Sequence, residues 1–294
     1  MRHLIITLSA LLFTTPTLFA EEIDIYLLGG QSNMRGVGLL PDLTEAERQA
    51  PAGVSFWTGE EFVALIPGKV ITSVEPLEFG PELGLAHAIA SPQRRSGIVK
   101  HALGGMPLHP GWNGQTWVGG EPAPGRVTYY PGTSSDDPAM GTLYIAMRKR
   151  FREAIAAVHA NGETPRIVGF VWMQGEQDAK HEVSASSYAK YLRLLRDRLA
   201  SDLNLSELPM VYGQVLPHNP PHPKYVYRDI VRREMAAADH RSGKAESIPL
   251  AQMVSTDKFP LKADTVHYNA RGQWQLGLAF AHALSQLSAT TNVK

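Results

Sequence analysis

The sequence predicts an α/β fold in which helices pack on a mostly parallel sheet. Short apolar runs alternate along the chain with longer amphipathic stretches, and the runs lack the polar alternation of strands that face water. Strands that alternate with helices are typical of a doubly wound α/β sandwich. About 270 residues follow the first twenty, which suits one large domain, so residues 21–294 are expected to form a single unit.

Five mostly apolar runs are predicted to be strands, because each is short and apolar enough for a buried parallel sheet. They are residues 23–28, 97–102, 166–173, 210–216 and 248–254. A helix is expected behind Asp137-Pro138, a favourable helix start, because apolar residues follow it at helical spacing. These residues are Leu143, Met147, Phe151, Ala154, Ile155 and Val158. Further helices are predicted over residues 188–203, 225–238 and 270–287.

The first twenty residues have the layout of a cleavable secretory signal. Arg2 and His3 precede the apolar residues 4–12, and Ala20 stands directly before two glutamates. A buried amphipathic helix or a membrane anchor is the alternative, but the apolar run is short for crossing a bilayer. We therefore expect export to the periplasm or the medium, removal of residues 1–20, and no stable membrane association afterwards.

Composition excludes several classes of function. Lys and Arg number 28 against 28 Asp and Glu, so no excess of positive charge is available for a nucleic-acid backbone. Cysteine is absent, which rules out disulfides, thiolate metal sites and a cysteine nucleophile. His218 and His222 lie in a stiff proline-rich stretch that gives two imidazoles no common helix face. We expect no metal and no other cofactor.

Ser32 and the Asp264-Thr265-Val266-His267 segment together contain the groups of a serine hydrolase. A serine hydroxyl becomes a nucleophile when a histidine takes its proton, and an acid must orient that histidine. The α/β-hydrolase elbow needs a glycine two residues after its serine, and Met34 stands there, so a different hydrolase design is predicted. The alternatives are that Ser32 only caps a helix and that Asp264 only closes a turn.

The other candidate polar groups also follow predicted strands. In parallel sheets the carboxyl ends of the strands meet at one edge, where ligands bind. The backbone N–H groups of Ser32 and Gly105 and the side-chain amide of Gln174 are expected to converge there as an oxyanion hole. The loop over residues 104–138 is rich in glycine and proline yet carries aromatic residues, so we expect it to be packed and functional.

Several sequence blocks resemble the sialate O-acetylesterase-like carbohydrate esterases, an SGNH-type hydrolase family that includes acetylxylan esterases. The blocks are Gly30-Gln31-Ser32-Asn33-Met34, Gly104-Gly105, Trp172-Met173-Gln174-Gly175-Glu176-Gln177-Asp178, Asp264-Thr265-Val266-His267-Tyr268-Asn269 and residues 79–84. The resemblance implies a three-layer α/β/α sandwich and metal-free removal of O-acetyl groups from carbohydrate. It also implies that Ser32 is the nucleophile and His267 the base, with either Asp264 or Glu176 as the acid.

The predicted substrate is an acetylated oligo- or polysaccharide, such as acetylxylan or an O-acetylated sialic acid. Gln31, Trp112 and Trp117 are candidate contacts to the sugar, although tryptophans are more often core residues. Met106 follows the glycine pair where relatives often have Thr or Ser, which leaves the shape of the acyl pocket open. A general carboxylesterase or lipase-like esterase and a non-catalytic carbohydrate-binding protein are the alternative functions.

Overall fold

A seven-stranded sheet forms the centre of the protein. The structure is a computed structural model and describes residues 21–291. The predicted signal, residues 1–20, lies outside the described residues. The strand order is β11-β10-β9-β1-β6-β3-β4, and neighbours run parallel except β3 and β4. The strands are β1 (Glu22–Gly30), β3 (Val54–Trp57), β4 (Phe62–Ala64), β6 (Ser96–Ala102), β9 (Thr164–Met173), β10 (Met210–Gly213) and β11 (Ala251–Val254). The short pairs β2 (Gly38–Leu39) with β5 (Glu78–Phe79) and β7 (Trp112–Asn113) with β8 (Thr116–Trp117) lie outside this sheet.

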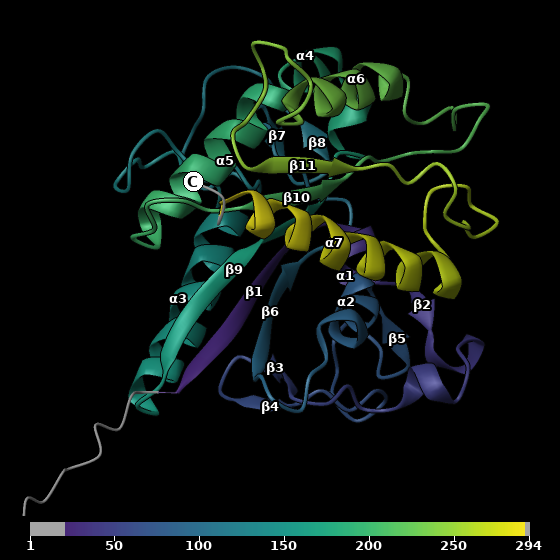
Figure 1. Ribbon diagram of the computed structural model, residues 1–294. Coiled ribbons are helices and arrows are strands. Elements are labelled where there is room, and N and C mark those ends of the chain that lie inside the picture. Colours follow the sequence, from purple (N-terminus) through teal and green to yellow (C-terminus); the bar gives the residue numbers. More distant parts are fainter. Residues whose placement is uncertain (1–20, 292–294) are drawn as a thin grey trace, which may run out of the picture.

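Helices lie on both faces of the sheet, as two consecutive residues of β9 show. A Cβ on Gly169 would lie 2.6 Å from Leu284 of α7, whereas the ring of Phe170 packs against Phe151 of α3. Successive strand residues point to opposite faces, so α7 and α3 cover opposite sides of the sheet. Figure 1 shows α7 and α2 in front of the sheet and α3 behind it. The predicted α/β sandwich with a mostly parallel sheet is confirmed.

All of the predicted helices and strands are present, with some ends shifted. The helices are α1 (Ser32–Arg35), α2 (Pro81–Ile89), α3 (Thr142–Ala160), α4 (Glu182–Ser186), α5 (Tyr188–Asp202), α6 (Arg228–Ala238) and α7 (Ala270–Thr291). Strand β10 ends three residues before the predicted end, and β11 begins three residues after the predicted start. Strands β3 and β4 and helix α2 were not predicted. Of the helices described, none has the length and apolarity needed to cross a membrane.

Three central strands end side by side, which brings the candidate polar groups to one edge. Gly30 at the end of β1 is in register with Ala102 of β6 and with Met173 of β9. Ser32, the Gly104-Gly105 pair and the 174–178 segment therefore leave the sheet at the same edge. The loop after β11 reaches that edge too, because Asn33 Nδ2 donates to the carbonyl of Val266 at 3.1 Å.

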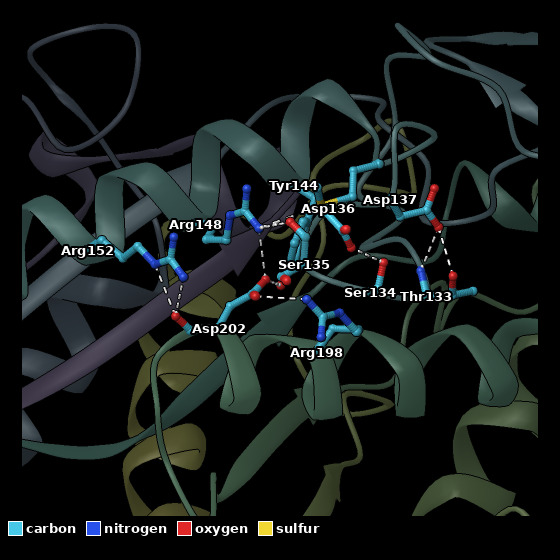
Figure 2. A network of polar contacts seen from close by, with 11 residues as sticks. Thr133, Ser134, Ser135, Asp136, Asp137, Tyr144, Arg148, Arg152, Arg198 and Asp202 are labelled. Carbon is cyan, nitrogen blue, oxygen red and sulfur yellow. Dashed lines mark hydrogen bonds and ion pairs between the residues drawn. The ribbon is translucent and has the colours of Figure 1, made fainter.

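A buried carboxylate at the end of α5 ties this helix to α3, as Figure 2 shows. Asp202 is 4% exposed, and its carboxylate accepts hydrogen bonds from Tyr144 (2.7 Å), Arg148 (3.1 Å) and Arg198 (2.8 Å). Arg152 donates to the backbone carbonyl of the same residue. Three of these four donors lie on α3, so the network fixes the two helices of this layer against each other.

Candidate active site

Ser32 lies directly after β1, where the chain turns from the sheet into α1. Gly30 has φ +149°, and a Cβ there would lie 2.1 Å from the carbonyl oxygen of Met173, so only glycine fits this turn. The Ser32 side chain does not cap α1, because the N-cap residue is Gln31. Its Oγ instead lies 2.9 Å from Nε2 of His267. The helix-cap alternative therefore does not account for Ser32.

Asp264 uses both of its carboxylate oxygens. Oδ2 lies 2.7 Å from Nδ1 of His267, while Oδ1 accepts the backbone N–H groups of Val266 and His267, each at 2.9 Å. Asp264 thus closes the turn and contacts the imidazole at once, and Thr265 adopts φ +60° within this turn. Burial alone would raise the pKa of Asp264, but the hydrogen bonds from His267 and Val266 together lower it below its usual value.

Glu176, the alternative acid, lies elsewhere in the site and does not hydrogen-bond to His267. Its Oε1 accepts a 2.7 Å hydrogen bond from Asn33 Nδ2, and its buried Oε2 has no partner among the described residues. Burial raises the pKa of Glu176, with the Asn33 hydrogen bond opposing the rise. The structure therefore brings Asp264 to Nδ1 of His267 and leaves Glu176 as a buried support.

Asn33 links the nucleophile segment to the loop that carries the base. In addition to its contact with Glu176, its Nδ2 donates to the carbonyl of Val266, and its Oδ1 accepts the N–H of Tyr268 at 3.1 Å. Those two residues flank His267 on either side. Asn33 is not among the predicted site residues, although its position directly after the candidate nucleophile is a signal that the sequence contains.

Gln174 does not serve as the predicted oxyanion donor. It is completely buried, and its Nε2 donates to Asp178 at 2.5 Å and to the carbonyl of Met106 at 3.1 Å, with Gln31 Oε1 also 3.3 Å away. An amide nitrogen has two N–H groups, and both are therefore engaged inside the protein. Its Oε1 accepts from Tyr188. The prediction that Gln174 donates to the oxyanion is therefore wrong. Its amide instead holds Asp178 and the carbonyl of Met106 in place.

Asp178 holds the loop that contains the glycine pair. Its buried carboxylate accepts the backbone N–H groups of Leu108 and His109, both at 3.0 Å, and the hydroxyl of Ser184 at 2.5 Å. Burial raises its pKa, and these hydrogen bonds oppose the rise. Asp178 belongs to one of the sequence blocks that resemble the family but is not among the predicted site residues. In the structure it fixes the path of the chain just after Gly105.

The backbone donors predicted for the oxyanion hole remain free. Gly105 has φ +69°, and neither its N–H nor that of Ser32 donates to another group in the described part of the chain. A Cβ on Gly104 would lie 3.7 Å from Cβ of Ser32, so the glycine pair passes close to the candidate nucleophile. Two free N–H groups near a serine suit an oxyanion that develops on an attacked carbonyl.

The three candidate sugar contacts differ in their accessibility. Gln31 is 3% exposed, and its Oε1 accepts from Gln174 and from the N–H of Gln177. Trp112 is 4% exposed and donates Nε1 to Ser184, so it belongs to the packed interior of the 104–138 loop. Trp117 is half-buried and stacks on His181 at 3.6 Å between ring centroids. Of the three, only Trp117 has appreciable exposed surface.

These contacts give the site the parts of a nucleophilic acyl-transfer centre: a serine, a histidine within hydrogen-bond reach and an acid on the far nitrogen of that histidine. Within residues 21–291, no three His, Asp or Glu side chains are grouped so that they could hold a metal ion. Residues 22–286 match the family described as carbohydrate esterase, sialic acid-specific acetylesterase. The chain belongs to this family. Membership of this carbohydrate esterase family supports deacetylation of carbohydrates as its activity.

Solved structures similar to this carbohydrate esterase share its fold. A protein from Arabidopsis thaliana has a TM-score of 0.64 at 22% identity, covering 91% of this chain and 98% of its own. The structure of NanS gives 0.58 at 16%, covering 92% of this chain and 99% of its own. A carbohydrate acetylesterase from Xanthomonas citri gives 0.57 at 16%, over 91% of this chain and 57% of its own. A comparison with curated protein sequences found no match.

Proposed function

We propose that this protein is an exported serine esterase that removes O-acetyl groups from carbohydrate. The observation that carries the proposal is the continuous contact from Ser32 Oγ through His267 to Asp264, with 2.9 Å on the serine side and 2.7 Å on the acid side. Membership of the carbohydrate esterase family supports an acetylated sugar as the substrate. The layout of residues 1–20 supports export.

In the first half of the reaction, Ser32 is acetylated and the sugar leaves. Oγ attacks the carbonyl carbon of the acetyl ester while Nε2 of His267 takes the hydroxyl proton. The N–H groups of Ser32 and Gly105 hold the negative oxygen of the tetrahedral intermediate, where removing one donor typically costs about 3 kcal/mol. The bond to the sugar oxygen then breaks, and His267 gives its proton to that oxygen.

In the second half, water releases the acetyl group. His267 takes a proton from the water, whose oxygen attacks the acetyl carbon, and the proton returns to Ser32 as acetate departs. Asp264 keeps its negative charge throughout, because its lowered pKa leaves it ionised at neutral pH. It holds the N–H of Nδ1 and stabilises the imidazolium that forms in each half-reaction.

The nucleophile is tested by Ser32→Ala, with Ser135→Ala as the control because Ser135 is an exposed serine far along the chain. We expect Ser32→Ala to have the melting temperature of the wild type and a kcat at least about a thousandfold lower. Ser135→Ala should match the wild type in both. A serine-directed phosphonate should label Ser32 alone. Wild-type turnover by Ser32→Ala would refute the mechanism.

The substrate is tested by measuring acetate release from acetylated xylan, O-acetylated sialic acid and an aryl acetate side by side. We expect a sugar acetate to be the best substrate by kcat/KM. A higher kcat/KM on long-chain acyl esters would indicate a general carboxylesterase or a lipase-like enzyme. No turnover of any ester, with sugar binding retained, would indicate a non-catalytic carbohydrate-binding protein.

A further inference from the structure

Asn33 carries a buried amide that contacts the protein on three sides, directly beside the candidate nucleophile. The residue is 1% exposed. Its Nδ2 donates to Glu176 Oε1 at 2.7 Å and to the carbonyl of Val266 at 3.1 Å, and its Oδ1 accepts the N–H of Tyr268 at 3.1 Å. Both N–H groups and the oxygen of this amide are therefore engaged inside the protein. Any effect of Asn33 on the reaction must pass through the groups that it holds.

The contacts of Asn33 on either side of His267 follow the pattern of a parallel β-bridge. In such a bridge one residue accepts from the N–H that follows the residue opposite it and donates to the carbonyl that precedes it. Asn33 does this with its side-chain amide, and His267 is the residue opposite. Because the peptide groups on both sides of His267 are held, the direction of its Cα–Cβ bond is held as well.

The backbone groups of His267 itself bond within its own loop. Its N–H donates to Asp264 Oδ1 at 2.9 Å, and its carbonyl accepts the N–H of Lys262 at 2.7 Å. Such bonds shape the loop but do not set its distance from Ser32. Asn33, in contrast, lies on α1 and follows Ser32 in the sequence. The residue that holds the loop and the residue whose hydroxyl meets the base are therefore neighbours on one short helix.

The three partners of Asn33 all require the same orientation of its amide. Glu176 Oε1 and the carbonyl of Val266 accept hydrogen bonds, whereas the N–H of Tyr268 donates one. A flipped amide would place its oxygen beside two acceptors and its nitrogen beside a donor. All three hydrogen bonds would then be lost in a buried environment, which is costly. Glu176 thus supports the orientation in which Asn33 can hold both neighbours of His267.

We propose that Asn33 is the positioning residue of the base: it holds His267 where Nε2 meets Ser32 Oγ, and Glu176 acts through Asn33. The inference rests on the proposed function, in which His267 takes the proton of Ser32. It gives the buried Glu176 a role that needs no contact with the imidazole. Misplacing a reacting group by about 1 Å can cost on the order of a hundredfold in rate, so a displaced loop should lower kcat.

Asn33→Asp tests the proposal, because it preserves the size of the side chain and removes both donors. The new carboxylate would face the acceptor oxygens of Glu176 and Val266. We expect kcat on an aryl acetate to fall on the order of a hundredfold, with KM within about threefold of the wild type because no substrate contact is lost. The rate at which a phosphonate labels Ser32 should fall together with kcat.

Gln252→Glu is the matched control. It also converts a buried amide into a carboxylate, since Gln252 is 7% exposed, and it removes a 2.8 Å hydrogen bond to Gln286. That bond joins β11 to α7 and includes no residue of the site. We expect Gln252→Glu to keep the kcat and the labelling rate of the wild type. A loss caused only by burying a carboxylate would instead lower both rates in this control as well.

The role of Glu176 is tested by combining Asn33→Asp with Glu176→Gln. The new amide at position 176 can donate to the new carboxylate at position 33, so one lost hydrogen bond returns with donor and acceptor exchanged. We expect the double variant to have a kcat on the order of tenfold higher than Asn33→Asp alone. A double variant no more active than Asn33→Asp would contradict the proposal that Glu176 acts through Asn33.

Crystal structures of the variants give a readout that does not depend on turnover. In Asn33→Asp, Nε2 of His267 should lie beyond about 3.5 Å from Ser32 Oγ, whereas Gln252→Glu should keep the 2.9 Å contact. Asn33→Ala introduces no charge and should show the same displacement, which keeps the test decisive if the new carboxylate prevents folding. An unchanged position of His267, or a kcat within about threefold of the wild type, would overturn the proposal. A wild-type protein that cleaves no ester would refute the proposed function alone, since the structures still decide whether Asn33 places His267.

Discussion

Asp264 contacts His267 from within the same four-residue turn, while Glu176 reaches the site from the end of β9 and bonds to Asn33. The environments of the two carboxylates also shift their pKa values in opposite directions. The pKa of Asp264 is lowered by hydrogen bonds, whereas burial raises the pKa of Glu176. In the proposed mechanism an ionised carboxylate stabilises an imidazolium, and Asp264 suits that role because it contacts Nδ1 of His267 and its pKa is lowered.

The assignment predicts opposite outcomes for two amide substitutions. In Asp264→Asn the new amide would donate to Nδ1 of His267, so Nε2 would carry the proton and could not accept one from Ser32. We expect a loss on the order of ten-thousandfold in kcat, measured on an aryl acetate.

Glu176→Gln is the matched comparison, because the new amide oxygen can still accept from Asn33. We expect its kcat to stay within about tenfold of the wild type. Thermal melts check that both variants fold. An inactive Glu176→Gln beside an active Asp264→Asn would transfer the acid role to Glu176.

At the residue scale, the sequence predicts which residues lie at the site better than it predicts which groups their side chains contact. The contact of Ser32 with His267 follows from the order of strands, because residues at the carboxyl ends of parallel strands must share an edge. Gln174 meets the same criterion, yet its amide turns inward to Asp178 and Met106. Which way a side chain points from a strand end depends on neighbours such as Asp178, and those are visible only in the structure.

Among the elements, α3 and α5 depend on a single buried carboxylate. Asp202 lies between the two helices, and two arginines and a tyrosine donate hydrogen bonds to its carboxylate oxygens (Figure 2). Removing a buried charge leaves the opposite charges uncompensated, which costs more than the pair itself contributes. The hydrogen bonds of this network include none to Ser32, His267 or Asp264, so its loss should affect stability more than chemistry.

Asp202→Asn should lower the free energy of unfolding by about 3 kcal/mol, because Arg148 and Arg198 would lose their counter-charge. Urea denaturation measures the change. The control is Asp197→Asn on the same helix, whose carboxylate is 52% exposed and pairs with Arg196; it should change stability by less than about 1 kcal/mol. Equal effects in the two variants would show that the buried network does not support the fold.

The elements that sequence analysis missed are short or carry unusual residues. Strands β3 and β4 have four and three residues, too few for a hydrophobic period to be recognised. Helix α2 contains Gly84, which normally disfavours a helix. Here the glycine is needed, because a Cβ would lie 2.2 Å from the carbonyl oxygen of Trp274 where α2 packs on α7. Tertiary packing, which a local pattern does not record, decides these cases.

For the molecule as a whole, acid should reduce stability through a buried imidazole. Burial, together with the nearby His181, Lys190 and Arg126, lowers the pKa of His109 to about 4. Its Nδ1 accepts the N–H of Gly111 at 2.8 Å, a bond that requires this nitrogen to be unprotonated. His109 therefore takes up a proton only near pH 4 in the folded protein, whereas in the unfolded chain it does so near pH 6.5.

The sign of the pH effect follows from proton counts. Between about pH 6.5 and pH 4 the unfolded state binds more protons at His109, so the free energy of unfolding falls as pH falls, by at most about 1.4 kcal/mol per pH unit. Urea denaturation at several pH values measures the slope. His109→Asn should have a shallower slope than the wild type, and His159→Gln, at an exposed position of α3, should keep it. An unchanged slope in His109→Asn would assign the acid sensitivity to other groups.

The 2.9 Å contact between Ser32 and His267 joins residues that are 235 positions apart. Asn33 makes the same connection, through Val266 and Tyr268. In the proposed mechanism, a chain that is synthesised from its amino end therefore carries its nucleophile for most of translation without the base that would activate it. Cleavage of an ester by that mechanism requires the segment at residue 267 to have been made and to have docked on α1. A chain truncated before residue 264 would then keep Ser32 and lack both other members of the proposed triad.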